Sequence, residues 1–309
     1  GCGIFKDLRE TNPLKKYKAI LKYKTLSVAF SEDGLNWGPA IPCPEADSHG
    51  DTHNNAFWAP TLNRYVAITR NWRKDGEKHI RQVARTSSED FETWEKTEFA
   101  LEGLDTNQQL YAMPVFFHGG IYLGLLAVHD QTSDRVWTEL TWSADTVNWE
   151  RVLPGTPLIG NDGGEGDYDW GCVYAASGPI FLQNEVRLYY GGSDGLHTSW
   201  RNGYFCMTSL RPDGFAGYSS EQGSITTVPI YDNEADVHIT ADVRVGGEVS
   251  VQALNERGDL VAESELLSSS VTDKKVSWRD PDSLRHCKGL FSQLRFICRD
   301  ATVYSFLLV

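Results

Sequence analysis

Three copies of one seven-residue motif, Ser-x-Asp-x-x-x-Trp, recur along the first half of the chain. They occupy residues 31–37, 88–94 and 143–149, so equivalent positions are 57 and then 55 residues apart. A regular spacing of this size is typical of repeat folds. The Ser and Asp side chains can accept hydrogen bonds from nearby backbone N–H groups, which favours a turn between two strands. Each Trp is expected to begin the next strand and to pack beneath the turn.

Strand patterns accompany the motif in groups of four, whereas helical periodicity is nearly absent. Consecutive four-stranded antiparallel modules are typical of β-propeller blades. Four blades can be identified, so the ring either closes with four or includes a fifth blade upstream of Gly1. The expected strands are residues 3–5, 17–23, 26–30 and the stretch after 37; 55–58, 64–70, 80–86 and the stretch from 94; 112–117, 121–126, 136–142 and 149–151; and 178–182, 186–190, 204–210 and 215–218.

The repeat ends near Gly223, and shorter alternating segments follow. Turn-forming residues at 245–247 and 255–258 separate some of them. We therefore expect an all-β chain with a β-propeller domain at 1–222 and a β-sandwich domain at 223–309. The strands expected in the second domain are residues 225–230, 237–243, 248–254, 275–278, 293–297 and 303–309.

Composition excludes some classes of partner. The formal net charge is −13 and no long basic stripe offsets it, so we expect no nucleic-acid partner. No apolar stretch is long enough for a membrane helix, so we expect no membrane partner. The chain contains 10 Trp, 13 Tyr and 13 Phe, an aromatic content that suits both an all-β core and sugar binding. The sequence does not predict the oligomeric state.

The six cysteines show no spacing typical of a metal site. Cys287 and Cys298 either form a disulfide or remain buried free thiols. This count does not settle the compartment, for which a secreted or cell-surface location is the working expectation. We expect no cofactor, although a structural calcium ion would suit loops rich in Asp and Asn.

A propeller brings the first strand of every blade to one axis, so the loops that enter these strands should share one funnel. The loops at 51–58, 105–111 and 163–170 carry carboxylates, amides and aromatic side chains. Glycoside cleavage uses two carboxyl groups, one to protonate the leaving oxygen and one to activate water or attack carbon. Asp51, Glu139 and Asp169 are the candidates. The alternative is that the aspartates cap turns, and that Glu139, inside a strand, is paired or exposed.

Polar and aromatic residues near the same loops are candidates for substrate contacts. Each also has a plainer explanation: an ordinary loop histidine, a solvated strand charge, a solvated acid or a core aromatic. The candidates are His53, Asn54, Trp58, Arg70, Arg85, Tyr111, His129, Glu165 and Trp170.

Several segments resemble the propeller glycoside hydrolases related to families 32 and 43, especially family 32-like bacterial proteins with a C-terminal β-sandwich. The similar segments are 51–58, 81–94, 139–151 and 169–174, whereas the invertase segment Trp-Met-Asn-Asp-Pro-Asn-Gly is absent. The resemblance implies a five-bladed propeller whose funnel uses three acidic residues. Asp51, Glu139 and Asp169 are the nearest matches by position.

Two functions from different classes follow. The first is a glycosidase in which Asp51 is the base or nucleophile and Glu139 or Asp169 is the acid. The second is a glycan-binding or scaffold protein without catalysis, because a fold does not fix a function. An acid pair facing one cavity would favour the first. A cavity lined by amides and aromatics, with the carboxylates turned away, would favour the second.

Overall fold

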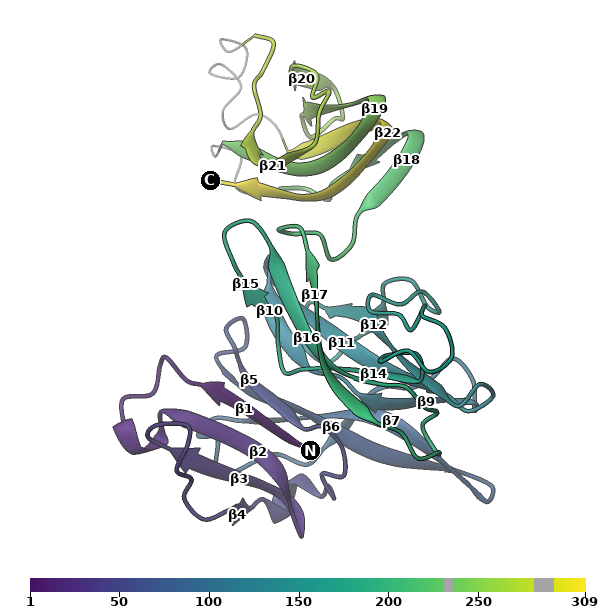
Figure 1. Ribbon diagram of the computed structural model, residues 1–309. Coiled ribbons are helices and arrows are strands. Elements are labelled where there is room, and N and C mark those ends of the chain that lie inside the picture. Colours follow the sequence, from purple (N-terminus) through teal and green to yellow (C-terminus); the bar gives the residue numbers. More distant parts are fainter. Residues whose placement is uncertain (231–235, 281–291) are drawn as a thin grey trace. The chain divides into compact units, whose positions relative to one another are not determined.

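The computed structural model describes residues 1–230, 236–280 and 292–309 (Figure 1). It divides into two compact units, Gly1–Phe181 with Arg187–Ser209 and Leu182–Val186 with Leu210–Val309. In the described residues the helices are single 3₁₀ turns, η1 (Pro13–Lys15) and η2 (Pro44–Ala46). Neither turn could cross a membrane. The rest of the regular structure is β-strand, which confirms the all-β class.

The first unit opens with two four-stranded antiparallel sheets in which every strand pairs with its neighbours in sequence. This up-and-down order is that of a propeller blade. The first three predicted strands of each of the first two modules agree closely with these sheets. The fourth strands begin later than expected, at Ile41 and Glu98, so Trp37 and Trp94 do not begin them. The first sheet contains β1 (Cys2–Lys6), β2 (Tyr17–Tyr23), β3 (Thr25–Ser31) and β4 (Ile41–Pro42), and the second contains β5 (Asn55–Ala59), β6 (Arg64–Asp75), β7 (Lys78–Ser88) and β8 (Glu98–Leu101).

The third and fourth modules form one nine-stranded sheet, because Val136 and Cys172 make a parallel pair between them. The strand expected at 112–117 is interrupted at Pro114, which has no N–H to donate. The strand that pairs with β16 starts at Cys172, earlier than the expected start at 178. The strands are β9 (Gln108–Ala112), β10 (Val115–His118), β11 (Ile121–Asp130), β12 (Arg135–Ser143), β13 (Glu150–Arg151), β14 (Cys172–Ala175), β15 (Ile180–Phe181), β16 (Val186–Ser193) and β17 (Gly203–Leu210).

The Ser-x-Asp motifs form the same turn three times. In the third, Asp145 Oδ1 accepts hydrogen bonds from the N–H groups of Val147 and Asn148, each at 2.8 Å, and from Ser143 Oγ at 3.0 Å. The corresponding distances in the other two turns are 2.7–3.0 Å. The residue after each Asp has a φ of 67–77°, a left-handed conformation that these hydrogen bonds stabilise.

The core of the first unit lies between successive sheets. One apolar cluster joins Ile20 and Val28 of the first sheet to Ala67 and the turn residue Trp94 of the second. Another joins residues 57, 66 and 68 of the second sheet to residues of β9–β11. Each large apolar side chain buried in this way stabilises the fold by about 1.5–3 kcal/mol. This packing sets the first strands of successive sheets next to one another.

The second unit contains one five-stranded sheet in its described residues. β19 runs through the turn expected at 245–247, because residues 244–247 form a bulge opposite β22. β22 likewise joins two expected strands. The expected domain boundary at 222/223 falls within β18, and the two-sheet sandwich stays a prediction. The strands are β18 (Tyr218–Thr226), β19 (Val237–Leu254), β20 (Leu260–Glu263), β21 (Val271–Lys275) and β22 (Gln293–Leu308).

The cysteine in β22 belongs to the apolar core of this sheet. Cys298 is a buried free thiol. Its proposed partner Cys287 lies outside the described residues.

Candidate functional site

A cavity of about 840 Å³ lies in the first unit, where the first strands of its sheets converge. Its wall comes from β1, from β5 and the residues before it, from the β9–β10 connection, and from β14, β16 and β17 with the loop at 194–202. The expected funnel therefore exists. The lining residues used below are His53, Asn54, Tyr174, Gly192, Trp200, Arg201 and Tyr204.

Close backbone contacts form the β1–β5 part of the wall. A Cβ on Gly3 would lie 2.3 Å from the carbonyl oxygen of Asn54, so only glycine allows this approach. The Asn54 side chain donates to the carbonyls of Gly50 at 2.9 Å and Gly1 at 3.1 Å. Its Oδ1 accepts from the Thr69 hydroxyl at 2.7 Å. Asn54 thus holds the wall in place with all its polar atoms.

Aromatic and cationic side chains also line the cavity. The Trp200 side chain is 92% exposed, which is unusual for so large an apolar group. Arg201 Nη1 donates to the carbonyl of His197 at 2.5 Å, which fixes the guanidinium against the backbone of its own loop. His53 packs edge-on against Tyr174, with ring centroids 5.5 Å apart. Burial of the ring, followed by nearby positive charge that includes Arg70, lowers the pKa of His53.

Two of the predicted carboxylates lie near the cavity without lining it. Asp51 is exposed, and its Oδ1 is 3.9 Å from Lys22 Nζ. Asp169 is half-buried, and its Oδ2 accepts a hydrogen bond from the Tyr190 hydroxyl at 2.7 Å. A Cβ on the lining residue Gly192 would lie 3.0 Å from Asp169 Cβ, so Asp169 stands directly behind the wall.

Glu139, the third predicted carboxylate, is buried in β12 with 1% of its side chain exposed. Arg151 binds both its oxygens, with Nε–Oε2 at 2.8 Å and Nη2–Oε1 at 2.7 Å. The indole N–H of Trp137 donates to it at 2.7 Å, and the N–H of Gly155 at 3.1 Å. Glu139 is therefore paired, as the alternative to a catalytic role expected from the sequence. Within residues 1–230 no carboxylate lines the cavity.

The other predicted contact residues divide into two groups. His53 and Asn54 line the cavity, and Tyr111 lies one layer behind His53, with ring centroids 6.2 Å apart. The guanidinium of Arg70 lies 4.5 Å from the Tyr111 ring centroid, and Nη2 donates to the Tyr111 carbonyl at 2.9 Å. Burial, followed by the charge of Arg81, lowers the pKa of Arg70.

The remaining predicted contacts lie elsewhere in the first unit. Arg9 covers the Trp58 ring at 3.6 Å, and Arg135 lies 5.0 Å from the Trp170 ring. Arg85 Nε donates to the hydroxyl of Thr146, in the third Ser-x-Asp turn, at 3.0 Å. Glu165 is exposed in the loop before β14. In the part of the chain that the structure describes, none of these four lines the cavity.

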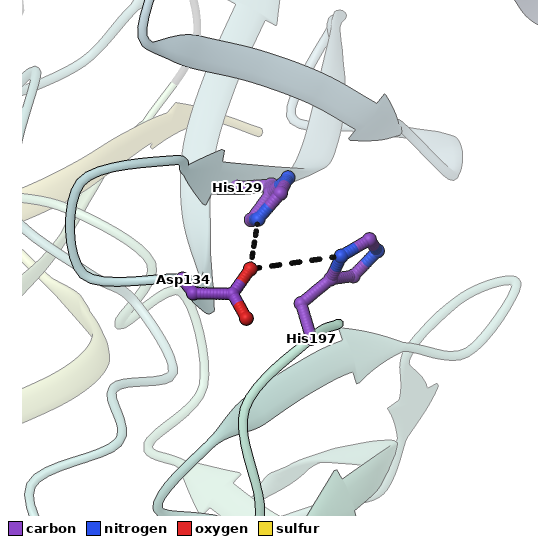
Figure 2. Close-up of side chains that lie close together, drawn as sticks. All are labelled: His129, Asp134 and His197. Atoms are coloured by element: carbon purple, nitrogen blue, oxygen red, sulfur yellow. Dashed lines mark hydrogen bonds and ion pairs between the residues drawn. The ribbon is translucent and has the colours of Figure 1, made fainter. Parts of the chain in front are cut away.

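His129 belongs to a different cluster, which the sequence did not reveal (Figure 2). Its Nε2 is 3.0 Å from Asp134 Oδ1, and His197 Nδ1 is 4.0 Å from the same oxygen. Burial, followed by the neighbouring His129, lowers the pKa of His197 to about 4. Asp134 and His197 are 63 residues apart, so no local pattern predicts that they meet. Trp200 was not predicted either. The sequence shows it only as an aromatic residue at the end of a segment rich in Gly and Ser.

No protein-family model and no curated protein matches the chain. Solved structures similar to it include an N-acetylgalactosamine deacetylase from F. plautii in complex with blood group B trisaccharide, with 14% identity, a TM-score of 0.47, and coverage of 69% of this chain and 72% of that one. Another is a glycoside hydrolase, with 14% identity, a TM-score of 0.48, and coverage of 62% and 61%. A family 32 β-fructofuranosidase from Bombyx mori has 10% identity, a TM-score of 0.40, and coverage of 100% and 76%. These values identify neither the family nor the substrate of the chain.

Proposed function

We propose that the first unit binds a carbohydrate in the cavity at its converging strands. The observation that carries this proposal is the lining: an exposed Trp200 and a fixed Arg201 face the same space as His53, Tyr174 and Tyr204. A sugar ring presents C–H faces to aromatic rings and hydroxyl groups to polar side chains. The volume of about 840 Å³ lies in the range of small-ligand sites.

The fixed polar groups support binding with little reorganisation. Arg201 Nη1 is held by the carbonyl of His197, and the Asn54 side chain keeps the β1–β5 part of the wall in place rather than contacting the ligand. Groups that are already ordered lose less entropy when a ligand binds. Trp200 then provides the stacking surface, and His53 can accept or donate one hydrogen bond.

Glycoside hydrolysis is the second candidate, and it depends on Asp169, which lies near the cavity without lining it. This carboxylate stands behind Gly192 and is hydrogen-bonded to Tyr190, while Asp51 precedes His53 by two residues. In this version Asp169 is the acid and Asp51 the base or nucleophile. Glu139 is committed to Arg151, and we assign it a structural role.

The test is calorimetric titration of the full chain with a panel of mono- and oligosaccharides. We expect at least one member to bind, and Trp200→Ala to weaken that binding about tenfold, which is about 1.4 kcal/mol. Phe205→Ala is the matched control, because Phe205 is 84% exposed on neighbouring β17 but does not line the cavity. Binding to no member, or equal loss in both variants, would refute the proposal.

The same panel, as aryl glycosides, separates binding from hydrolysis. Release of the reporter phenol that Asp169→Asn abolishes would establish the second candidate. Binding of a sugar without release of the phenol from any glycoside would leave carbohydrate binding as the function.

A further inference from the structure

Two histidines and one aspartate from separate segments meet in the first unit (Figure 2). His129 is the last residue but one of β11, Asp134 lies in the turn between β11 and β12, and His197 lies in the loop at 194–202. One ligand atom of each lies within 4.8 Å of the others. Two imidazole nitrogens and a carboxylate oxygen are an ordinary donor set for a divalent transition metal.

The surroundings of the cluster orient Asp134 towards both rings. Its Oδ2 accepts from the backbone N–H of Thr198 at 2.9 Å and from the Thr198 hydroxyl at 2.5 Å. Its Oδ1 is therefore left to the two histidines, as Figure 2 shows. In other proteins, carboxylates that bind a metal are likewise held by hydrogen bonds from neighbouring groups.

The rings of His129 and His197 lie in close contact, and the nitrogen of His197 that faces Asp134 lacks a hydrogen-bond partner in the described residues. Their centroids are 4.0 Å apart, and His129 is only 3% exposed. His197 Nδ1 points at Asp134 Oδ1 but is buried and has no hydrogen-bond partner in the described residues. A buried nitrogen without a partner is costly. An ion between the three atoms would satisfy it.

We propose that His129 Nε2, Asp134 Oδ1 and His197 Nδ1 bind one divalent transition-metal ion of the zinc class. Ligand atoms at about 2.0–2.2 Å from such an ion lie roughly 3.0–3.5 Å from one another. The distance between His129 Nε2 and Asp134 Oδ1, 3.0 Å, already fits. The distance from His197 Nδ1 to the same oxygen, 4.0 Å, needs a shift of less than about 1 Å. Calcium and magnesium prefer oxygen ligands and are disfavoured at this site.

The proposed ion would link the loop at 194–202 to the turn between β11 and β12. His197 is three residues before Trp200, and its carbonyl accepts the hydrogen bond from Arg201. Fixing the His197 side chain to Asp134 therefore also fixes the backbone that carries two cavity residues. Three protein ligands would leave at least one coordination position open to water.

The test uses the full chain, stripped of metal with a chelator and then titrated with Zn²⁺ by calorimetry. We expect one equivalent to bind and the melting temperature to rise by several degrees. His197→Gln should lower the affinity at least a hundredfold. His238→Gln is the matched control, because His238 Nδ1 is 3.0 Å from Asp273 Oδ1 in the second unit without a second histidine in the described residues.

Three results would overturn the proposal: no Zn²⁺ bound by the wild type, equal affinity of wild type and His197→Gln, or preference for Ca²⁺ over Zn²⁺. Should His197→Gln not fold, the visible absorption of Co²⁺ bound to the wild type decides instead. Bands of a nitrogen- and oxygen-ligated ion would support the site, and the spectrum of the hydrated ion would refute it.

Discussion

The two ends of the sheets in the first unit differ in how their polar groups are used. At the Ser-x-Asp turns, the three aspartates accept the same set of hydrogen bonds in every sheet. At the converging strands the residues differ from sheet to sheet. Buried nitrogens of Arg70, Arg81, His129 and His197 there have no hydrogen-bond partner in the described residues, whereas the Ser-x-Asp end has one such atom, Arg64 Nε beside the second turn.

The two ends therefore differ in their capacity to bind a ligand. A carboxylate that is saturated by its own backbone stabilises a turn and has no capacity left for a ligand. Buried polar groups without partners are costly, and such groups are found where a ligand or ion completes them. We therefore attribute the repeated end to stability and the varied end to function.

The largest expected effect is on the buried ion pair in β12. Arg151→Met leaves the buried Glu139 without its ionic partner, so we expect the free energy of unfolding to fall by about 3–5 kcal/mol. Urea denaturation measures it. If Glu139→Gln abolished sugar turnover while the protein kept its full stability, Glu139 would be catalytic and our assignment would be wrong.

A smaller effect is expected where β14 begins beside the cavity loop. A Cβ on Gly171 would lie 1.8 Å from the Gly195 carbonyl oxygen. Gly171→Ala should therefore lower the free energy of unfolding by about 1–3 kcal/mol and displace the loop that carries Trp200. Gly178→Ala is the control, because its Cβ would meet no atom within 4 Å. Weaker sugar binding in both variants would contradict the account.

The repeated turns should affect stability alone. Asp145→Ala removes the acceptor for the N–H groups of Val147 and Asn148, so we expect a loss of about 1–2 kcal/mol by urea denaturation. Sugar affinity should not change. Glu89→Ala, at an exposed position of the second turn, should leave both quantities unchanged.

The smallest effect is the pH dependence of the same turn. Burial would raise the pKa of Asp145, but hydrogen bonds from Asn148 and Val147 outweigh it and lower the pKa to about 2. Because the folded pKa is below the unfolded value of about 3.9, this stabilisation is full above pH 4 and is lost as the pH falls through about 2. The stability gap between wild type and Asp145→Asn should therefore shrink between pH 5 and pH 2. A gap that stays constant over this range would mean that these hydrogen bonds do not lower the pKa of Asp145.

Local patterns predicted much of the first unit. Strand alternation located the strands of the first two sheets, and the Ser-x-Asp spacing located turns whose hydrogen bonds join residues two or three positions apart. The parallel pair of Val136 and Cys172 joins residues with no common local pattern, so the merging of two modules was not predicted. In the second unit, turn residues at 245–247 suggested a break where β19 bulges and continues.

The candidate site was predicted only in part for the same reason. The repeat indicated that the first strands converge, and it drew attention to His53 and Asn54. The partner of Glu139 is Arg151 on β13, and the partners of His129 come from two loops. Glu139 and Arg151 lie on paired strands of one sheet, whereas the approach of His197 to Asp134 brings together segments 63 residues apart. The catalytic roles of Asp51 and Asp169 stay predictions.

Hydrogen–deuterium exchange of the full chain, with and without a sugar that binds, locates the binding site on the sheets. We predict that the sugar protects the backbone at 53–55, 174–177 and 199–204, and leaves exchange at 31–37, 88–94 and 143–149 unchanged. Protection confined to the Ser-x-Asp turns or to the second unit would contradict the claim that the converging strands form the binding site.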